Sequence, residues 1–589
     1  MFVSRKSRAC LVGGALVAAA IIFFAGLGRP PLFEPDEGRY AEVAREMLLR
    51  SDFVTPRNDF VRYFEKPPLV YWVTAAALRI FGHNEFAARF QAAFFSAGEV
   101  AITADLGATM FGLSAGVLGA LALALSPLFY AFARFATPDP ALAFFMTAAI
   151  AAFWYAARAP GFATRRSRYL MLAAAALLAL GTLAKGPVAL VLVGAIALVW
   201  LIAEGRSRDA LRLPWFGCVA VYLAIAAPWF VLAAYRNPGF LKFFFVHEHL
   251  HRYLANNEHR WGPWFFVPIV IGGAWPWVFF APSGVAGLRA VTERADSPAD
   301  AVQSRSAFIY LALWFAIIFI FFSIPGSKLG EYILPAIPPL AILCGVGLER
   351  TARMPHARKI RILGAFTAIN AALAIAVAIA AFVIRARVVE ALGDDAIVAG
   401  SALAVGALGA LAMAWRTRSR DAVWTIAAPI AIGAIIVLGA MAKAREDAEP
   451  FTSYRRLARA ISPYLGDGCV LASYRHQIQA LPFYLGVREV LVGYRGELAP
   501  FGDSPAAAAT FIATDWRLAA AWSARSCVVV IADRKDVPHL RMLLKPAPSI
   551  IGCEGQKMAL FNRPARWFAA PPPACGAEFG GVGGVKPSK

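Results

Sequence analysis

Long apolar runs constrain this chain more than any other feature. A run such as "LVGGALVAAAIIFFAGLG" carries no charge, and it approaches the roughly 20 residues that a membrane-spanning helix needs. The chain of 589 residues is 59% hydrophobic and only 16% charged, whereas soluble domains are nearer to one quarter charged. The sequence therefore predicts a polytopic α-helical membrane protein.

We expect about thirteen membrane-spanning helices. Two of them are separated by the break Lys185-Gly186-Pro187, and a further apolar piece at 69–82 is either an interfacial helix or part of a span. The expected spans are residues 9–28, 86–109, 112–132, 139–157, 169–184, 187–203, 213–234, 263–282, 306–324, 332–349, 361–384, 396–415 and 421–440.

Basic loops predict the orientation of the chain, because short loops rich in Lys and Arg stay in the cytoplasm. With thirteen spans, the stretches "SRKSR", "RRSR", "RSRDALR", "ERTARMPHARKIR" and "RTRSR" all fall on one side. This pattern favours a cytoplasmic N-terminus and a C-terminus on the outer side. Alternatively, residues 1–28 are a cleaved signal peptide, although their apolar part is long for one.

The sequence predicts two domains and a tail. Residues 1–440 form the membrane domain, and its long outer loops, 29–85 and 235–262, are expected to carry function. Residues 441–570 form a small α/β domain with the expected strands "CVLASY", "REVLVGY" and "SCVVVIAD", and 571–589 is a disordered Pro/Gly-rich tail. Cys469, Cys527, Cys553 and Cys575 permit one or two disulfides. No nucleotide-binding loop is found.

Three acids lie close together just after the first span, at the start of "FEPDEGRYAEVAREM", namely Glu34, Asp36 and Glu37. Asp36 stands where a helix begins, so one reading makes it a helix N-cap. A cap explains one carboxylate but not three, which favours a functional site. The spacing also predicts an amphipathic helix that lies along the membrane surface. Its apolar face would contain Tyr40, Val43, Met47 and Leu48.

Two further clusters lie in the outer loops. Glu65 and Lys66 precede the stiff pair Pro67-Pro68, and they form either part of a site or an interfacial ion pair. The stretch "FFFVHEHLHRY" contains His247, His249 and Arg252. Histidine with carboxylate can bind a divalent metal ion, although interfacial hydrogen bonding is the simpler role for these histidines. The guanidinium of Arg252 can donate two parallel hydrogen bonds to a phosphate.

Three charges lie at the ends of spans: Asp139, Lys185 and Lys328. Such charges are costly near the membrane and tend to mark sites. With thirteen spans, all three open to the same side as the two long loops. The sequence therefore predicts an outer cavity, with carboxylates among Lys and Arg, that suits a phosphorylated lipid.

These stretches also carry a resemblance. In chain order, "FEPDEGRYAEVAREM", "TPRNDFVRYFEKPPLVYW", "EFAARF", "TPDPAL", "LAKGP", "EHLHRY" and "SKLGEYILPAIPPLA" resemble the bacterial lipid A aminoarabinose transferases, which belong to the wider protein O-mannosyltransferase-like enzymes. The resemblance covers about residues 1–350. It implies a GT-C glycosyltransferase fold in the bacterial inner membrane, with a periplasmic active site and C-terminal domain.

The resemblance also implies substrates. The donor would be 4-amino-4-deoxy-L-arabinose on undecaprenyl phosphate, and the acceptor would be a phosphate of lipid A. The product would then mask phosphate charge and confer resistance to polymyxin. No nucleic acid partner is expected, and we expect a monomer.

Roles for individual residues follow from the same resemblance. One divalent metal ion, zinc or similar, is expected on Glu65 with His249 or His247. The expected catalytic residues are Asp36, Glu65 and Asp139. The residues expected to bind the donor phosphate or lipid are Arg57, Lys66, Lys185, Arg252, Lys328 and Tyr332.

The sequence is also compatible with two other functions. A polyprenyl-phosphate-dependent glycosyltransferase that modifies a protein hydroxyl or another glycan would keep the fold and change the acceptor. A lipid transporter without catalysis would need charge on both faces of the membrane, whereas the informative charge here lies on one face.

Overall fold

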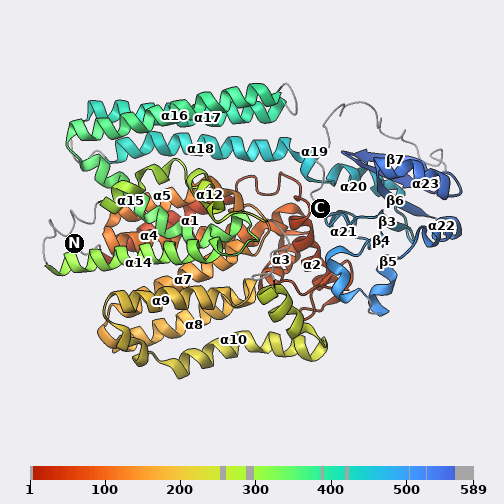
Figure 1. Cartoon of the computed structure of the whole chain (residues 1–589), viewed down its shortest axis with the longest axis horizontal. Coiled ribbons are helices and arrows are strands. Elements are labelled where there is room, and N and C mark those ends of the chain that lie inside the picture. The colour runs from red at the N-terminus through yellow and green to blue at the C-terminus, as the bar shows by residue number, and fades with distance from the viewer. Residues whose placement is uncertain are drawn as a thin grey trace. The chain divides into compact units, whose positions relative to one another are not determined.

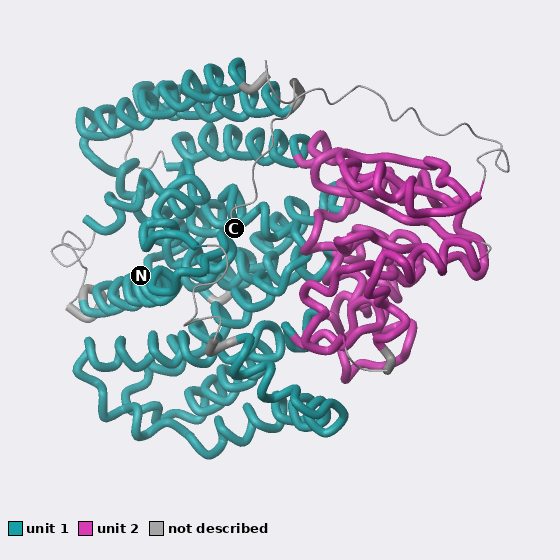
Figure 2. The backbone as a smooth tube through the Cα atoms, turned by 45° about the vertical axis from the view of Figure 1, so that its right-hand side comes forward, with its two compact units in different colours: residues 1–27, 65–70, 89–444 teal, residues 28–64, 71–88, 445–589 magenta. Residues whose placement is uncertain are grey.

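The computed structural model describes residues 4–251, 260–286, 298–385, 390–417, 423–502, 505–525 and 527–563. The chain divides into two compact units (Figure 2). Unit 1 comprises Met1–Leu27, Glu65–Val70 and Arg89–Ala444, and unit 2 comprises Gly28–Phe64, Tyr71–Ala88 and Arg445–Lys589. Most of the first long loop therefore belongs to the same compact unit as the C-terminal residues.

Unit 1 is built mainly from apolar helices, most of them long (Figure 1). In chain order they are α1 (Arg5–Phe24), α4 (Glu85–Phe111), α5 (Leu113–Ala124), α6 (Pro127–Ala133), α7 (Asp139–Ala157), α8 (Arg165–Lys185), α9 (Val188–Ala203), α10 (Trp215–Arg236), α12 (Phe266–Gly273), α14 (Pro298–Ser323), α15 (Ile337–Arg353), α16 (His356–Arg385), α17 (Glu390–Arg416) and α18 (Val423–Asp447). A π-helix, η3 (Lys242–His251), and a 3-10 helix, η6 (Gly330–Ala336), lie between them.

Within the described residues, nine helices are long and apolar enough to cross a membrane, and two bent helix pairs raise the count to eleven. The pairs are Leu113–Ala124 with Pro127–Ala133, bent by 64°, and Pro263–Gly273 with Trp277–Ala286, bent by 99°. All thirteen predicted segments contain helix, but α4 carries Glu99 and Asp105 and α9 has only 16 residues. The polytopic helical fold is confirmed, while the count of thirteen spans stays a prediction.

The apolar piece at 69–82 forms a separate helix, α3 (Leu69–Phe81), of 13 residues. At 1.5 Å per residue it is about 20 Å long. The hydrocarbon core of a bilayer is about 30 Å thick, so α3 is too short to cross it alone.

Unit 2 contains a six-stranded sheet in the order β5-β4-β3-β6-β8-β7. The strands β5, β4, β3 and β6 run parallel, and β8 and β7 continue the sheet in antiparallel fashion. The three strands expected from the sequence are β3, β4 and β6, so the predicted α/β domain is confirmed. The strand bounds are β3 (Val470–Tyr474), β4 (Glu489–Val492), β5 (Phe511–Ile512), β6 (Val528–Asp533), β7 (Ser549–Glu554) and β8 (Lys557–Phe561).

Alternating side chains of the strands pack against helices on both faces of this sheet. Leu471 and Val529 join a core with α20 (Arg455–Ile461) and α21 (Leu481–Leu485). Ala472 and Val530 point the other way, into a core with α22 (Asp515–Ala524) and α23 (Val537–Leu543). Because both faces of each strand are buried, its residues are apolar at successive positions, and the strands appear in the sequence as continuous apolar runs.

The predicted amphipathic helix is α2 (Asp36–Arg50), but its apolar face does not lie along a membrane surface. Tyr40, Val43 and Met47 are buried in a core with Leu491 and Leu498 of the C-terminal region. The prediction of a surface helix was therefore wrong. An apolar stripe shows that a face is buried but does not show what covers it.

One disulfide is present between described cysteines. Cys469 precedes β3 and Cys527 precedes β6, and the two are bonded across 58 residues. Cys553 is also disulfide-bonded, and Cys575 lies outside the described residues. The bond joins the starts of two neighbouring parallel strands, so it closes a loop around the centre of the sheet.

We expect the double variant Cys469→Ser/Cys527→Ser to be less stable by about 2–4 kcal/mol, because the disulfide restricts the unfolded chain. Thermal unfolding of the purified, detergent-solubilised protein measures this loss. Cys10→Ser removes an exposed free thiol and serves as the control. Equal melting temperatures for all three proteins would contradict the expectation.

Candidate active site

A cavity of about 510 Å³ in unit 1 contains several of the charges singled out in the sequence. We call it the charged cavity. Most of its wall is apolar, with Phe245, Phe321 and Phe322 prominent. Its charged and phenolic lining residues are Lys66, Asp139, Lys185, Glu248 and Tyr332. Four of these five were predicted, and Glu248 was missed as a site residue although it lies in the stretch "HEH".

The ends of two helices place opposite charges in this cavity. Asp139 is the first residue of α7, and Lys185 is the last residue of α8. An acid at a helix N-terminus and a base at a C-terminus both oppose the helix dipole favourably. The sequence breaks Pro138 and Gly186-Pro187 end the neighbouring segments at these positions, so the polar groups lie at the cavity and not inside the apolar helices.

Asp139 and Lys185 form a buried ion pair. Their side chains are only 4% and 14% exposed, and the Lys185 ammonium lies 4.6 Å from the ring centroid of Tyr332. A buried charge must be paired to be tolerated, and an aromatic face adds a cation–π attraction. These contacts fix Lys185 at the edge of the cavity.

Lys66 also lines the charged cavity, near Glu248. Its Nζ donates to the backbone carbonyl of Glu65 at 3.2 Å and lies 4.0 Å from Oε2 of Glu248. The second distance exceeds that of a hydrogen bond.

Lys328 lies behind the cavity wall. It is 1% exposed, and its Nζ donates to the carbonyls of Trp261, at 3.0 Å, and of Pro325. Since Pro325 and Ser327 line the cavity, Lys328 holds the wall in place through backbone contacts.

The predicted metal ligands are only partly described. His247 stacks on Phe243 with ring centroids 5.3 Å apart, and its Nδ1 lies 3.6 Å from Oε1 of Glu248. The side chain of His249 and all of Arg252 lie outside the described residues. Among the residues that the structure describes, no group of three His, Cys, Asp or Glu could hold a metal ion.

The three acids of the opening stretch lie in unit 2, where the structure separates their roles. Glu34 accepts the backbone N–H of Ala480 at 2.6 Å and that of Gln479 at 3.1 Å. Glu37 is fully buried, accepts the N–H of Phe33 at 2.9 Å and pairs with Arg445. Two of the three acids therefore hold the fold together.

Asp36 differs from its two neighbours because its side chain is 42% exposed. It is the first residue of α2, and its side chain does not cap that helix. Its carboxylate pairs with Arg39, which also pairs with Glu497. Tyr63 donates from its hydroxyl to Glu497 at 3.3 Å. A chain of polar contacts thus links the exposed carboxylate of Asp36 to the C-terminal region.

Gly38 explains another part of the same stretch. A Cβ atom built at this position would lie 2.5 Å from the backbone nitrogen of Ala480, which is closer than van der Waals contact permits. Glycine is therefore needed where α2 meets the turn between β3 and α21. The stretch "PDEGRY" therefore contains the glycine that this close approach requires, in addition to its charged residues.

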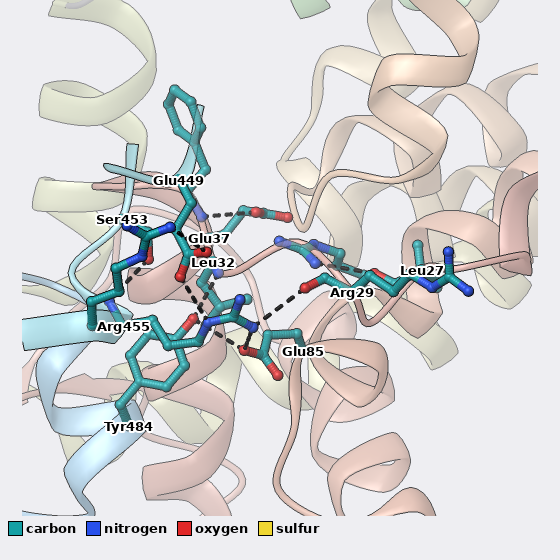
Figure 3. Close-up of polar contacts among 12 residues, drawn as sticks. Leu27, Arg29, Leu32, Glu37, Glu85, Glu449, Ser453, Arg455 and Tyr484 are labelled. Carbon is teal, nitrogen blue, oxygen red and sulfur yellow. Dashed lines mark hydrogen bonds and ion pairs between the residues drawn. The ribbon is translucent and has the colours of Figure 1, made fainter. Parts of the chain in front are cut away.

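Arg455 forms a further polar cluster in unit 2 (Figure 3). Its guanidinium donates to Glu85 at 3.0 Å, to Glu449 at 3.2 Å and to the carbonyl of Arg29 at 3.3 Å. Arg57, the second predicted site residue in unit 2, donates to the carbonyl of Phe60 at 3.4 Å. Both arginines make backbone contacts that stabilise the first loop.

Comparisons with known proteins bear on this site. Residues 65–232 match the family model described as dolichyl-phosphate-mannose-protein mannosyltransferase. The undecaprenyl phosphate-alpha-4-amino-4-deoxy-L-arabinose arabinosyl transferase of Enterobacter sp. (strain 638) is 32% identical over 349 residues, which are 59% of this chain and 60% of that protein. A protein of the same name, with the suffix 1, from Pseudomonas fluorescens (strain Pf0-1) is 30% identical over 369 residues, 62% of each chain.

The structural likeness extends further along the chain. The crystal structure of ArnT from Cupriavidus metallidurans bound to undecaprenyl phosphate is 28% identical, with a TM-score of 0.81, and the match covers 94% of this chain and 98% of that one. The chain is related to the bacterial aminoarabinose transferases and has their GT-C fold. It spans about 60% of the length of the curated aminoarabinose transferases that it matches in sequence.

We expect Glu34 to make the stability of the protein depend on pH. Burial raises the pKa of this carboxyl from 4.5 to about 7, against the opposing effect of its two backbone hydrogen bonds. A carboxyl with a raised pKa in the folded state binds its proton more tightly there. Its stabilising contribution is therefore complete below about pH 4.5 and is lost as the pH rises through about 7.

Melting temperatures of the wild type and Glu34→Gln, measured from about pH 4.5 to about pH 8, test this expectation. The amide of the variant cannot titrate, so the melting temperature of the wild type relative to the variant should fall by several degrees as the pH rises. Parallel profiles for the two proteins would show that Glu34 keeps an ordinary pKa.

Proposed function

We propose that this chain is a membrane glycosyltransferase that moves 4-amino-4-deoxy-L-arabinose from undecaprenyl phosphate to a phosphate of lipid A. The observation that carries the proposal is the charged cavity, in which Lys66 and Lys185 meet a wall rich in phenylalanine. A lipid phosphate has the matching chemistry, since its head is anionic and its chain is apolar. The likeness to ArnT bound to undecaprenyl phosphate supports the same ligand class.

In the proposed reaction, an oxygen of the acceptor phosphate forms a bond to the anomeric carbon of the sugar from the face opposite the leaving group. The bond between that carbon and the donor phosphate oxygen breaks, and undecaprenyl phosphate leaves with the electron pair. The configuration is inverted. An acceptor phosphomonoester has a second pKa of about 6, so it is already an anion at neutral pH and needs little help from a base.

In this scheme the cations contribute most to catalysis, because they stabilise the negative charge that develops on the leaving phosphate. We assign its stabilisation to Lys66 and Arg252, with Lys185 held nearby by Asp139. Fixed cations in a site of low dielectric stabilise such charge strongly. Asp36, the exposed acid of the opening stretch, is assigned to charge at the anomeric carbon or to the amino group of the sugar.

We further propose an inner-membrane location, with the N-terminus in the cytoplasm and unit 2 in the periplasm. The one-sided basic loops support this orientation. The disulfide between Cys469 and Cys527 fits an oxidising compartment. Masking of lipid A phosphates on that face would reduce the binding of cationic peptides such as polymyxin.

A second candidate acceptor is a protein hydroxyl. The family model that matches residues 65–232 is described as a protein mannosyltransferase that uses dolichyl-phosphate-mannose. A hydroxyl must lose its proton during attack, so Asp36 would then act as a general base. Mild acid distinguishes the two products, because it releases a phosphate-linked sugar and leaves an O-glycoside intact.

Mass spectrometry of lipid A from cells that make the donor and express this chain tests the proposal. We expect an added aminopentose with the wild type, and a loss of about 10²–10³ in transfer rate with Lys66→Ala at saturating donor. Asp36→Asn should also reduce transfer strongly while the protein level stays normal.

Lys535→Ala, which removes an exposed lysine of unit 2, is the control and should transfer normally. An unchanged rate for Lys66→Ala would contradict the assigned role of that lysine. Unmodified lipid A in wild-type cells would overturn the acceptor and direct attention to protein or glycan acceptors.

A bound metal ion is a separate proposal. Glu65 with His247 or His249 would hold one divalent ion such as zinc, and carboxylate with imidazole is a suitable donor set. Elemental analysis of the purified protein should then find about one ion per chain in the wild type and less in Glu65→Ala. Equal metal content in both proteins would contradict it. No step of the reaction above depends on this ion.

A further inference from the structure

Four arginines of unit 2 lie around one short hairpin. The hairpin joins β1 (Arg57–Asn58) to β2 (Val61–Arg62) through a two-residue turn. Two of the arginines stand opposite each other on its strands, one is the last residue of α2, and one comes directly before β4. We call this set the arginine cluster, and its members are Arg50, Arg57, Arg62 and Arg488. The proposed reaction assigns no step to any of them.

The turn of the hairpin presents an aromatic ring to two of these arginines. Asp59 and Phe60 form the turn with φ angles of 53° and 68°, a region that bulky side chains rarely adopt. The guanidinium carbons of Arg488 and Arg50 lie over the ring of Phe60, 4.1 and 5.8 Å from its centroid. Backbone strain of this kind concentrates at functional sites, so the ring and its two cations are candidates for a binding surface.

The positive charge of the cluster is not matched by paired carboxylates. Arg57 and Arg62 stand directly opposite each other on the two strands, where like charges are destabilising. Within the described residues, none of the four arginines forms an ion pair. Two acids near Arg57, Asp52 and Glu46, accept backbone N–H groups instead. Neighbouring cations that lack carboxylate partners form a surface that attracts anions.

Arg57 also carries a donor group that points to a ligand. Its Nε is buried and has no hydrogen-bond partner among the described residues. Its Nη1 reaches the carbonyl of Phe60 only at 3.4 Å, which is long for a hydrogen bond. Burial above all, and then the neighbouring Arg50 and Arg62, lower the pKa of Arg57. An anion at this position would accept the Nε–H and offset the repulsion between the guanidinium groups.

Exposed apolar side chains beside the cluster indicate that the anion belongs to a lipid. Leu49 and Phe53 precede and follow Arg50, and they are 59% and 43% exposed. The indole N–H of Trp72 donates to the carbonyl of Phe53 at 2.8 Å, and tryptophan is typical of the interface between membrane and water. Guanidinium groups beside exposed hydrocarbon fit a lipid with an anionic head better than they fit a free phosphate ion.

We propose that the arginine cluster binds a second phosphate of the lipid A acceptor, while the first phosphate takes part in the reaction. This inference rests on the proposed function. Lipid A is an acylated disaccharide with a phosphate at each end, so one phosphate can anchor the molecule while the other accepts the sugar. Arg62 stands four residues before Lys66 of the charged cavity, and the backbone between them spans at most about 14 Å.

The number of arginines favours this acceptor over a bulk phospholipid. The phosphate of a glycerophospholipid is a diester with a single negative charge, whereas a phosphomonoester carries about −1.5 to −2 at neutral pH. Four guanidinium groups match the larger charge, and their planar forks bind the several oxygens of a phosphomonoester in pairs.

The double variant Arg50→Gln/Arg488→Gln tests the cluster without breaking an ion pair. Neither side chain has a hydrogen-bond or ion-pair partner within the described chain, so the variant should fold and melt within a few degrees of the wild type. Arg517→Gln/Arg541→Gln is the matched control. It removes two exposed arginines of unit 2 outside the cluster, and Arg517 likewise lies over an aromatic ring, that of Trp516, at 5.3 Å.

The experiment measures transfer by the purified protein to lipid A with both phosphates and to two monophosphoryl forms that each keep one. With intact lipid A, the cluster variant should raise the KM for the acceptor by about tenfold or more, because charge-assisted hydrogen bonds to phosphate are lost. Its kcat and its KM for the donor should stay within about twofold of the wild type. The control variant should change none of these constants.

The monophosphoryl forms show which phosphate the cluster binds. In the wild type, the form that keeps only the reacting phosphate should already have the raised KM, and the cluster variant should not raise it further. A second arm adds phosphatidylglycerol in excess over the acceptor. It should leave the acceptor KM of the wild type and of the cluster variant unchanged.

Each other outcome overturns the inference. Equal acceptor KM values for the wild type and the cluster variant would mean that the cluster does not bind the acceptor. An equal rise with intact and monophosphoryl lipid A would mean that it does not contact a second phosphate. Competition by phosphatidylglycerol in the wild type alone would assign the cluster to bulk phospholipid. Absence of transfer to any form of lipid A by the wild type would overturn the proposed function, and with it this inference.

Discussion

The carboxylate of Glu34 is the contact on which the arrangement of unit 2 depends. It accepts two successive backbone N–H groups at the turn between β3 and α21. The strand order places the switch between β3 and β6 at the centre of the sheet, and the carboxyl ends of strands at such a switch are where open α/β sheets bind ligands. Here the chain's own first loop supplies the hydrogen-bond acceptor. Glu37 with Arg445, and Gly38 against Ala480, extend the same junction.

Much of the fold follows from local sequence patterns. Apolar runs located all thirteen helical segments, and short β-branched runs located β3, β4 and β6, because these signals arise from burial within each element. The core in which α2 is buried could not be predicted from local sequence patterns. The periodicity of Tyr40, Val43 and Met47 fixes which face is buried, whereas their partners Leu491 and Leu498 lie more than 400 residues away in sequence.

The candidate site was predictable where charge interrupts apolar sequence. Lys66, Asp139, Lys185 and Tyr332 line one cavity, since charged residues at helix ends have few other places to lie in a membrane protein. Glu497 could not be found in this way. It lies in an ordinary polar segment, and its partner Arg39 is 458 residues away. No local pattern distinguishes the exposed Asp36 from its structural neighbours Glu34 and Glu37, because the partners that hold the two glutamates, Ala480 and Arg445, lie more than 400 residues away in sequence.

The shared core of α2 and the C-terminal sheet has a consequence for engineering this protein. A boundary drawn near residue 440 would separate Val43 and Met47 from Leu491 and Leu498, and would leave Glu34 and Glu37 without their partners. Chimeric proteins that exchange only the C-terminal region would therefore mismatch a core and a set of buried carboxylates. The exchangeable module is discontinuous: it consists of the first loop together with the C-terminal sheet.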